Sequence, residues 1–205
     1  FIYEKLTAGE FLRFHGGLVS SALQTLWEAG AMDPDAPITT GVVLGNASFH
    51  DFVARLDPLR LADVTKTHDP AILATIPRFV AINAAAEVDL FGQINGERVG
   101  GMIQAGSGGL PAFAQGALAS PGGRLLICLG ATARKGTVSR IVSVLGDQSL
   151  CTVPRYQADA VVTEHGVAEL RGLSLDARAE ALIGIAAPEH RTALQEAWSS
   201  IRRAA

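Results

Sequence analysis

The sequence predicts an α/β fold with a mainly parallel sheet and helices on both of its faces. Apolar runs of strand length alternate along the chain with segments whose apolar residues recur at helical spacing. Several strand-like runs, such as Arg124–Leu129, are almost continuously apolar, as is typical of strands covered on both faces. Because the sequence has no internal repeat, low-complexity run or long linker, we predict a single domain over residues 1–205.

The strands are predicted from alternating or continuous apolar runs bounded by turn residues. The first, Phe11–His15, alternates and ends at two glycines, so His15 is placed at its end. Another apolar run, Phe79–Asn83, opens the central part of the chain. The expected strands are 11–15, 38–45, 59–64, 79–83, 87–93, 124–129, 139–145 and 160–163.

The helices are predicted from helical spacing together with capping residues. Asn46 or Ser48 is expected to cap the second helix, and Ser174 the fifth. Proline near the first turn marks the start of the last helix, and Gly30 the end of the first. The expected helices are 18–29, about 47–56, 70–75, 111–119, 174–185 and 188–202.

The composition excludes several classes of protein. Hydrophobic residues make up 48% of the 205 residues, so a large core can form and disorder is not expected. A net charge of −3 gives no basic surface for nucleic acid, and no apolar run approaches the length of a membrane span. The five histidines lack metal-ligand spacing, so no metal site is expected.

Cysteine usage and the first residue bear on where the protein works. The two cysteines, Cys128 and Cys151, lie in apolar runs without C-x-x-C spacing. We expect both cysteines to be buried and reduced, and we expect the protein to be cytoplasmic. The chain begins at Phe1 rather than at methionine and resembles the middle of a larger protein, although trimming would explain this equally well.

The stretch 81–109 contains the most distinctive local pattern. Glu87 and Asp89 are two residues apart, which places both carboxylates on one face of a strand. The turn Gly106–Gly109 precedes a helix that begins near Pro111, and such a turn presents backbone N–H groups that suit a phosphate or carboxylate. The alternative is a tight connection that binds nothing.

Polar residues also lie at the predicted ends of strands, where open α/β sheets bind ligands. These include His15, His68 and Glu164. At the end of a buried strand the carboxyl group of Glu164 is expected to be desolvated, which would raise its pKa. The alternative is that these residues are caps or surface groups, and their spacing alone names no reaction.

Five segments in order carry a family resemblance: FHGGLVSSAL, AINAAAEVDLFGQINGERVGG, AGSGG, GGRLLICLGATARKGTVSRIV and VVTEHGVAELRGLS. Together they resemble the acetyl-CoA hydrolase/transferase family, which includes the 4-hydroxybutyrate and succinyl-CoA:acetate CoA-transferases. The resemblance covers nearly the whole chain and matches the C-terminal half of the family.

The resemblance implies a two-lobed enzyme in which each lobe is α/β (NagB/RpiA-like) and acyl-CoA binds between them. The expected partners are therefore acyl-CoA, a small carboxylate and the missing N-terminal lobe, and we expect a homo-oligomer. Coenzyme A would be a substrate, with no permanently bound cofactor. In the family a glutamate attacks the thioester to give an acyl-glutamyl anhydride and then a glutamyl-CoA thioester, in a site that excludes water.

Two positions depart from the family pattern. The nucleophilic glutamate lies two residues after a strand-end histidine, at the start of a helix; the histidine matches His15 and the glutamate position is Gly17. An asparagine whose amide stabilises the oxyanion is matched by His68, before Asp69. An imidazole can still donate a hydrogen bond to an oxyanion.

Other family positions are retained. Glu164 matches a second active-site glutamate that orients the nucleophile. The glycine loop at the CoA site is matched by Gly106, Gly108 and Gly109, and positions in or near the site by Asn83, Glu87, Asp89, Ser139 and Arg140.

Three functions are compatible with this pattern. The first is an acyl-CoA hydrolase, in which Glu164 or a nearby histidine activates water and His68 with backbone N–H groups binds the oxyanion. The second is a CoA-transferase whose carboxylate comes from Glu87 or from the missing lobe. The third is a non-catalytic CoA-binding or partner subunit, because loss of a nucleophile without a substitute reduces activity by orders of magnitude.

Overall fold

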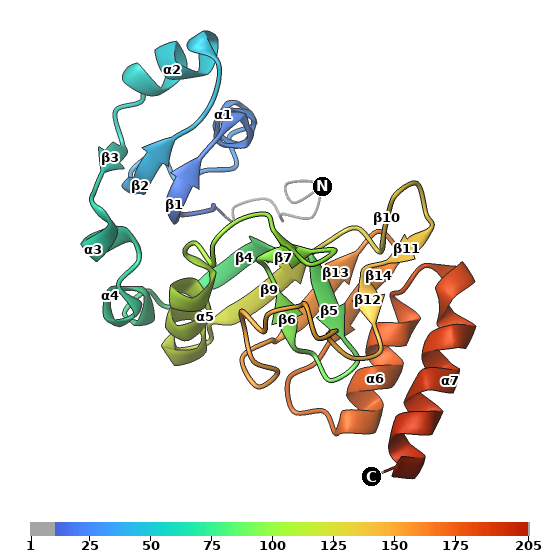
Figure 1. The fold of residues 1–205 in the computed structure, drawn as a ribbon. Coiled ribbons are helices and arrows are strands. Elements are labelled where there is room, and N and C mark those ends of the chain that lie inside the picture. Colours follow the sequence, from blue (N-terminus) through green and yellow to red (C-terminus); the bar gives the residue numbers. More distant parts are fainter. Residues whose placement is uncertain (1–10, 205) are drawn as a thin grey trace. The chain divides into compact units, whose positions relative to one another are not determined.

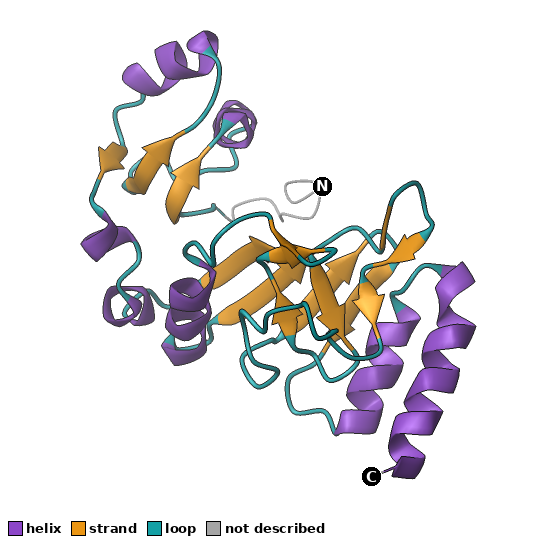
Figure 2. Ribbon diagram, viewed as in Figure 1, coloured by secondary structure: helices purple, strands orange, loops and turns teal. Residues whose placement is uncertain are grey.

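The computed structural model describes residues 11–204, and the chain divides into two compact units (Figure 1). The first unit ends at Ile72 and the second begins at Leu73. Strands and helices follow one another through both (Figure 2), which confirms the α/β class. A single domain over residues 1–205 stays a prediction.

The first unit is built on a parallel three-stranded sheet in the order β1-β2-β3. Val19 on β1, Ile38 on β2 and Phe49 on the second helix are buried in its apolar core. The Asn46 side chain caps that helix by accepting the Phe49 N–H at 3.0 Å, as predicted. Its elements are β1 (His15–Val19), α1 (Ser21–Glu28), β2 (Ile38–Val43), α2 (Ala47–Ala54), β3 (Leu59–Leu61) and α3 (Val64–Thr67), with α4 (Pro70–Ala74) spanning the boundary between the units.

The first strand and first helix differ from the prediction. His15 begins β1 instead of ending a strand, and Gly17 lies inside β1 instead of at the start of a helix. Leu18 and Val19, predicted to be helical, pair with Val42 and Val43 of β2. Strand pairing with a distant segment therefore overrides the local helical spacing, and the helix begins only at Ser21.

The second unit contains a four-stranded sheet in the order β14-β13-β9-β4. Strands β4, β9 and β13 are parallel, and β14 pairs antiparallel with β13 at one edge. Helices α6 and α7 lie side by side (Figure 1). The elements are β4 (Val80–Ala84), β5 (Glu87–Asp89), β6 (Ile94–Asn95), β7 (Arg98–Val99), β8 (Met102–Ile103), α5 (Leu110–Ala119), β9 (Arg124–Cys128), β10 (Thr132–Ala133), β11 (Val138–Ser139), β12 (Ile141–Val142), β13 (Ala160–Thr163), β14 (Gly166–Glu169), α6 (Leu175–Gly184) and α7 (Pro188–Ala204).

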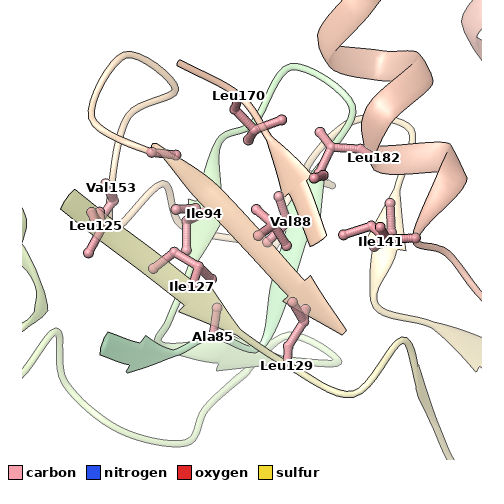
Figure 3. Close-up of a cluster of buried hydrophobic side chains, with 14 of the residues drawn as sticks. Ala85, Val88, Ile94, Leu125, Ile127, Leu129, Ile141, Val153, Leu170 and Leu182 are labelled. Atoms are coloured by element: carbon pink, nitrogen blue, oxygen red, sulfur yellow. The ribbon is translucent and has the colours of Figure 1, made fainter. Parts of the chain in front are cut away.

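The core of the second unit lies on one face of this sheet. Leu125 and Ile127 of β9 are fully buried beside Val88 and Ile94 (Figure 3), whereas the alternate residues of β9 are only half-buried. The predicted continuous burial of Arg124–Leu129 is therefore replaced by an alternating pattern.

Several predicted boundaries agree with the structure, and others do not. The strand 160–163 and the cap at Ser174 are confirmed. The expected strand 139–145 is instead two short strands, β11 and β12, on either side of Arg140. Both cysteines were expected to be buried, but Cys128 is only partly buried and Cys151 is exposed.

Substituting Gly116 in α5 should destabilise the second unit. A Cβ atom at Gly116 would lie 2.3 Å from the Cβ of Leu73, whose side chain is fully buried. We expect Gly116→Ala to lower the free energy of unfolding by about 1–3 kcal/mol, because α5 must move away from α4. Urea unfolding followed by circular dichroism measures this change.

The matched control is Gly184→Ala in α6, where a Cβ would meet no atom within 4 Å. Gly184 is the last residue of α6 and its φ is not in the left-handed region, so this variant should be unchanged or more stable by about 0.4–1 kcal/mol, because alanine lowers the conformational entropy of the unfolded chain. Equal stabilities of the two variants would contradict the close packing of α5 on Leu73.

Candidate functional site

The first unit brings together three of the predicted site residues. His15 and Gly17 lie on β1, and His68 follows α3 as its C-terminal cap. The ring of His15 donates from Nε2 to the Thr67 carbonyl oxygen at 3.2 Å. The peptide that precedes His68 is thereby tied to β1.

The His68 ring occupies the space in which a side chain at position 17 would begin. An ideal Cβ on Gly17 would lie 2.7 Å from Cε1 and 2.8 Å from Nε2 of His68. Real Cβ atoms do not approach other atoms this closely, so a side chain at position 17 requires the imidazole to move. Gly17 and His68 are thus sterically coupled, although 51 positions separate them in the sequence.

Thr67 fixes the His68 ring and was not predicted as a site residue. Its side chain is fully buried, and its Oγ1 lies 2.8 Å from Nδ1 of His68. The same hydroxyl donates to the carbonyl oxygen of Asp63 at 3.2 Å. The sequence offers little signal for this role, since a threonine at the end of a four-residue helix is ordinary.

Glu164 lies immediately after β13, in the second unit. Its side chain is 51% exposed, and its Oε2 accepts the backbone N–H of Ala131 at 2.9 Å. That bond, with the backbone N–H of Glu164 itself, holds the pKa of this carboxyl below its ordinary value of 4.5. The expected rise in pKa through desolvation is therefore wrong, because the carboxylate is exposed and accepts hydrogen bonds.

The glycine loop precedes α5 as predicted, with the helix beginning at Leu110. Gly106 and Gly108 are exposed, and a Cβ on either would meet no atom within 4 Å. Gly109 occupies the N-cap position without a side-chain hydrogen bond to the helix. Backbone N–H groups at such a helix start can bind an anion, which stays a prediction for this loop.

The two acids of the central stretch belong to separate hydrogen-bond networks. Asp89 is fully buried and accepts the N–H groups of Phe91 at 3.0 Å and Gln93 at 2.9 Å, so it closes a turn. Glu87 accepts from Asn95 Nδ2 at 3.0 Å and from Ser149 Oγ at 2.9 Å. Asp89 is thus structural, and Glu87 is the acid of the two that remains partly accessible.

The remaining predicted positions lie on strands of the second unit or beside them. The Oδ1 of Asn83 on β4 is buried and has no hydrogen-bond partner among the described residues. Ser139 donates from Oγ to the Ile141 carbonyl at 2.7 Å, and the Arg140 N–H donates to the Ala131 carbonyl at 2.9 Å. These bonds connect Ala131, whose N–H is held by Glu164, with the β11–β12 segment.

Neither cysteine is an activated nucleophile, and the described residues hold no cluster of metal-ligating side chains. Desolvation of the sulfur raises the pKa of the Cys128 thiol above its ordinary value of 9.0, and partial desolvation with the nearby Asp89 raises that of the Cys151 thiol, so both are protonated at neutral pH. Residues 11–204 contain no group of three or more metal-ligating side chains, and no helix among them has the length and apolar character to cross a membrane.

The two units, each with parallel strands and helices, define an α/β protein built on open sheets. The chain belongs to the acetyl-CoA hydrolase/transferase family, because the family model of the C-terminal domain matches residues 45–198. That match includes His68, Glu164 and the glycine loop and begins after Gly17.

Curated relatives support this assignment. The 4-hydroxybutyrate coenzyme A transferase of Clostridium kluyveri is 34% identical over 189 residues, which are 89% of this chain and 44% of that protein. The acetyl-CoA hydrolase of Candida albicans is 29% identical, over 83% of this chain and 32% of that protein. The chain therefore spans somewhat less than half the length of the first relative and about a third of the length of the second.

Solved structures show the same fold. A 4-hydroxybutyrate CoA-transferase from Porphyromonas gingivalis has a TM-score of 0.81 and 31% identity, and the match covers 100% of this chain and 48% of that one. RipA from Yersinia pestis has a TM-score of 0.85 and 30% identity, over 95% of this chain and 45% of that one. The CoA-transferase-like α/β fold expected from the sequence is confirmed.

The hydrogen bond between Ala131 and Glu164 gives a prediction about pH. Because the pKa of Glu164 is lowered, the bond should be complete above the ordinary value of 4.5 and should be lost as pH falls through the lower folded-state pKa. The amide ¹H shift of Ala131, followed by NMR from pH 7 to 3, should titrate with a midpoint below 4.5.

Glu164→Gln is the control, and it should abolish this titration without unfolding the protein. A midpoint above 4.5 in the unsubstituted protein would mean that desolvation outweighs the hydrogen bonds to the carboxylate.

Proposed function

We propose that this chain is the C-terminal domain of an acyl-CoA hydrolase, which cleaves an acetyl-CoA-like thioester with water. The observation that carries the proposal is the pairing of Gly17 with His68. Gly17 has no side chain that could form an acyl-enzyme, and the imidazole of His68 occupies the space in which such a side chain would begin. Acyl-CoA is the proposed substrate, and no permanently bound cofactor is proposed.

The distinction between hydrolysis and transfer depends on how the acyl group is held. A transferase that works through a carboxylate must keep the acyl group covalently while coenzyme A and the second acid exchange places. Hydrolysis needs a water molecule, a base for its proton and donors for the oxyanion. A site with glycine at the nucleophile position lacks the carboxylate that transfer requires, whereas hydrolysis does not require it.

The proposed site residues are Gly17, His68 and His15 in the first unit and Glu164 in the second. Gly106, Gly108 and Gly109 are proposed to bind a phosphate of coenzyme A through backbone N–H groups. The relatives comprise enzymes named as CoA-transferases and one named as an acetyl-CoA hydrolase, both of which act on CoA thioesters. A cytoplasmic homo-oligomer with a further N-terminal lobe is part of the proposal.

A second candidate is a non-catalytic CoA-binding or partner subunit. It is favoured by the glycine at position 17, which supplies no nucleophile. Neither Asp89, which is buried in a turn, nor the cysteines, which are not thiolates at neutral pH, would replace the missing carboxylate. In the CoA-transferase alternative, by contrast, Glu87 or a carboxylate of the missing lobe would serve as the nucleophile.

Thiol release from acetyl-CoA separates these functions. The full-length protein is incubated with acetyl-CoA, with and without a carboxylate acceptor, while free thiol and new thioesters are measured. We expect thiol release that needs no acceptor, because water is the proposed attacking group. Exchange of thioesters that requires the acceptor would instead support transfer, and binding of coenzyme A without either reaction would support the non-catalytic subunit.

A second prediction concerns the glutamate position. Gly17→Glu alone should form no covalent intermediate, because its Cβ would lie 2.7 Å from Cε1 of His68. Gly17→Glu combined with His68→Asn removes the imidazole and should form a glutamyl-CoA thioester. Borohydride reduction followed by peptide mass spectrometry detects the trapped residue.

The unsubstituted protein is the control for trapping, since it has no carboxylate at position 17. Trapping in the single variant would contradict the steric exclusion. A folded double variant that binds acyl-CoA and shows no trapping would contradict the placement of the nucleophile position at Gly17.

A further inference from the structure

We propose that a cavity between α1 and α2 of the first unit binds a small molecule in which a planar aromatic ring carries a positively charged amino group. The cavity has a volume of about 700 Å³, and it shares no residue with the site proposed for the thioester. The inference therefore goes beyond the proposed function and does not depend on it. It rests on the aromatic and charged side chains that line the cavity.

The two helices contact each other within the first unit (Figure 1), and each contributes one face to the cavity. Residues three or four apart on a helix lie on the same face, and the lining residues have this spacing. Those used below are Gln24, Trp27 and Glu28 from α1, Phe52 and the C-cap Arg55 from α2, and Asp57 from the loop before β3.

Two aromatic side chains form apolar walls of the cavity. Trp27 and Phe52 pack against the core of the first unit but are only partly buried, so part of each ring is open to the cavity. Phe52 also stacks on the buried Phe49, with 6.1 Å between the ring centroids and 23° between the ring planes. Walls of this kind bind planar rings by stacking and cations through the negative face of the ring.

The charged residues give the cavity a net negative charge. Glu28 and Asp57 supply two carboxylates, and Arg55 supplies one guanidinium. Within residues 11–204, no ion pair involves any of these three side chains. The Nε of Arg55 donates instead to the carbonyl oxygen of Asp51 at 2.9 Å. The two carboxylates therefore lack a cationic partner in the part of the chain that the structure describes.

The carboxylates also have acceptor positions that the protein does not use. Gln24 donates from Nε2 to Oε1 of Glu28 at 2.7 Å, which orients this carboxylate within the cavity. Each carboxylate oxygen accepts about two hydrogen bonds. Oε2 of Glu28 and both side-chain oxygens of Asp57 accept none from the described residues, so they are available to the N–H groups of an amine.

These features favour an aromatic cation over other ligands. A phosphate or carboxylate would lie near two carboxylates and a single guanidinium, which is repulsive overall. An uncharged ring would stack on Trp27 and Phe52 but would gain nothing from the acids. A flat ring with an ammonium group matches both the walls and the charge, and the volume is in the range of small-molecule sites.

Two compounds with the same ring and opposite charge test the inference. Tryptamine or indole-3-acetate is added to the full chain, and the indole N–H signal of Trp27 is followed by ¹H–¹⁵N NMR. Trp198, whose Nε1 donates to Asp176 at 3.0 Å in the second unit, is the internal reference. We expect a saturable shift of Trp27 with tryptamine and binding of indole-3-acetate that is at least about tenfold weaker, because the acids attract only the amine.

Variants of the cavity locate the bound amine. Glu28→Gln combined with Asp57→Asn keeps the side-chain shapes and should weaken tryptamine binding about tenfold, because both acceptors lose their charge. Arg55→Gln should leave the affinity unchanged or raise it, since it removes the one cation of the lining. The matched control is Asp35→Asn combined with Asp51→Asn, which removes the same charge from exposed acids outside the lining and should change the affinity less than about twofold.

The outcomes decide the inference without reference to thiol release from acetyl-CoA. Saturable binding of tryptamine that is weakened in the cavity variant and kept in the control supports the site. The inference is overturned if Trp27 shows no saturable shift at up to about 10 mM tryptamine, or if both compounds bind equally. Equal weakening in the two double variants would also overturn it, because the amine would then respond only to the overall charge. Failure of the proposed hydrolysis would leave each of these results unchanged.

Discussion

The Cα of Gly17 faces a space that only one group can occupy. In this protein the group is the imidazole of His68, whose Nε2 would lie 2.8 Å from a Cβ at position 17. A carboxylate on that residue and this ring cannot be present together without a rearrangement. Under the proposed function, this steric exclusion between two residues that are distant in the sequence favours attack by water over covalent chemistry at position 17.

The fold of the first unit places the two residues together. Parallel pairing of β1 with β2 sets the position of Gly17, and the short helix α3 delivers His68 to the same place. Thr67 and His15 then hold the ring and its peptide by hydrogen bonds of 2.8 and 3.2 Å. Each bond is modest, but together they hold the ring and its peptide beside Gly17.

The sequence predicted the α/β class and most helices, because buried strands and capped helices have strong local patterns. It misplaced the start of α1, since pairing of Leu18 with β2 is a long-range contact. It named Gly17 and His68 separately, but the contact between them depends on the fold. The pKa of Glu164 was predicted in the wrong direction because neither its exposure nor the Ala131 N–H could be inferred from spacing.

A crystal structure with a non-hydrolysable acyl-CoA analogue, such as a thioether ketone, tests the central claim most directly. The account predicts that the carbonyl carbon of the analogue lies beside the His68 ring and the Cα of Gly17, with no protein carboxylate oxygen within about 3.5 Å of it. A carbonyl carbon placed away from the His68 ring, or one with a protein carboxylate oxygen within that distance, would contradict it.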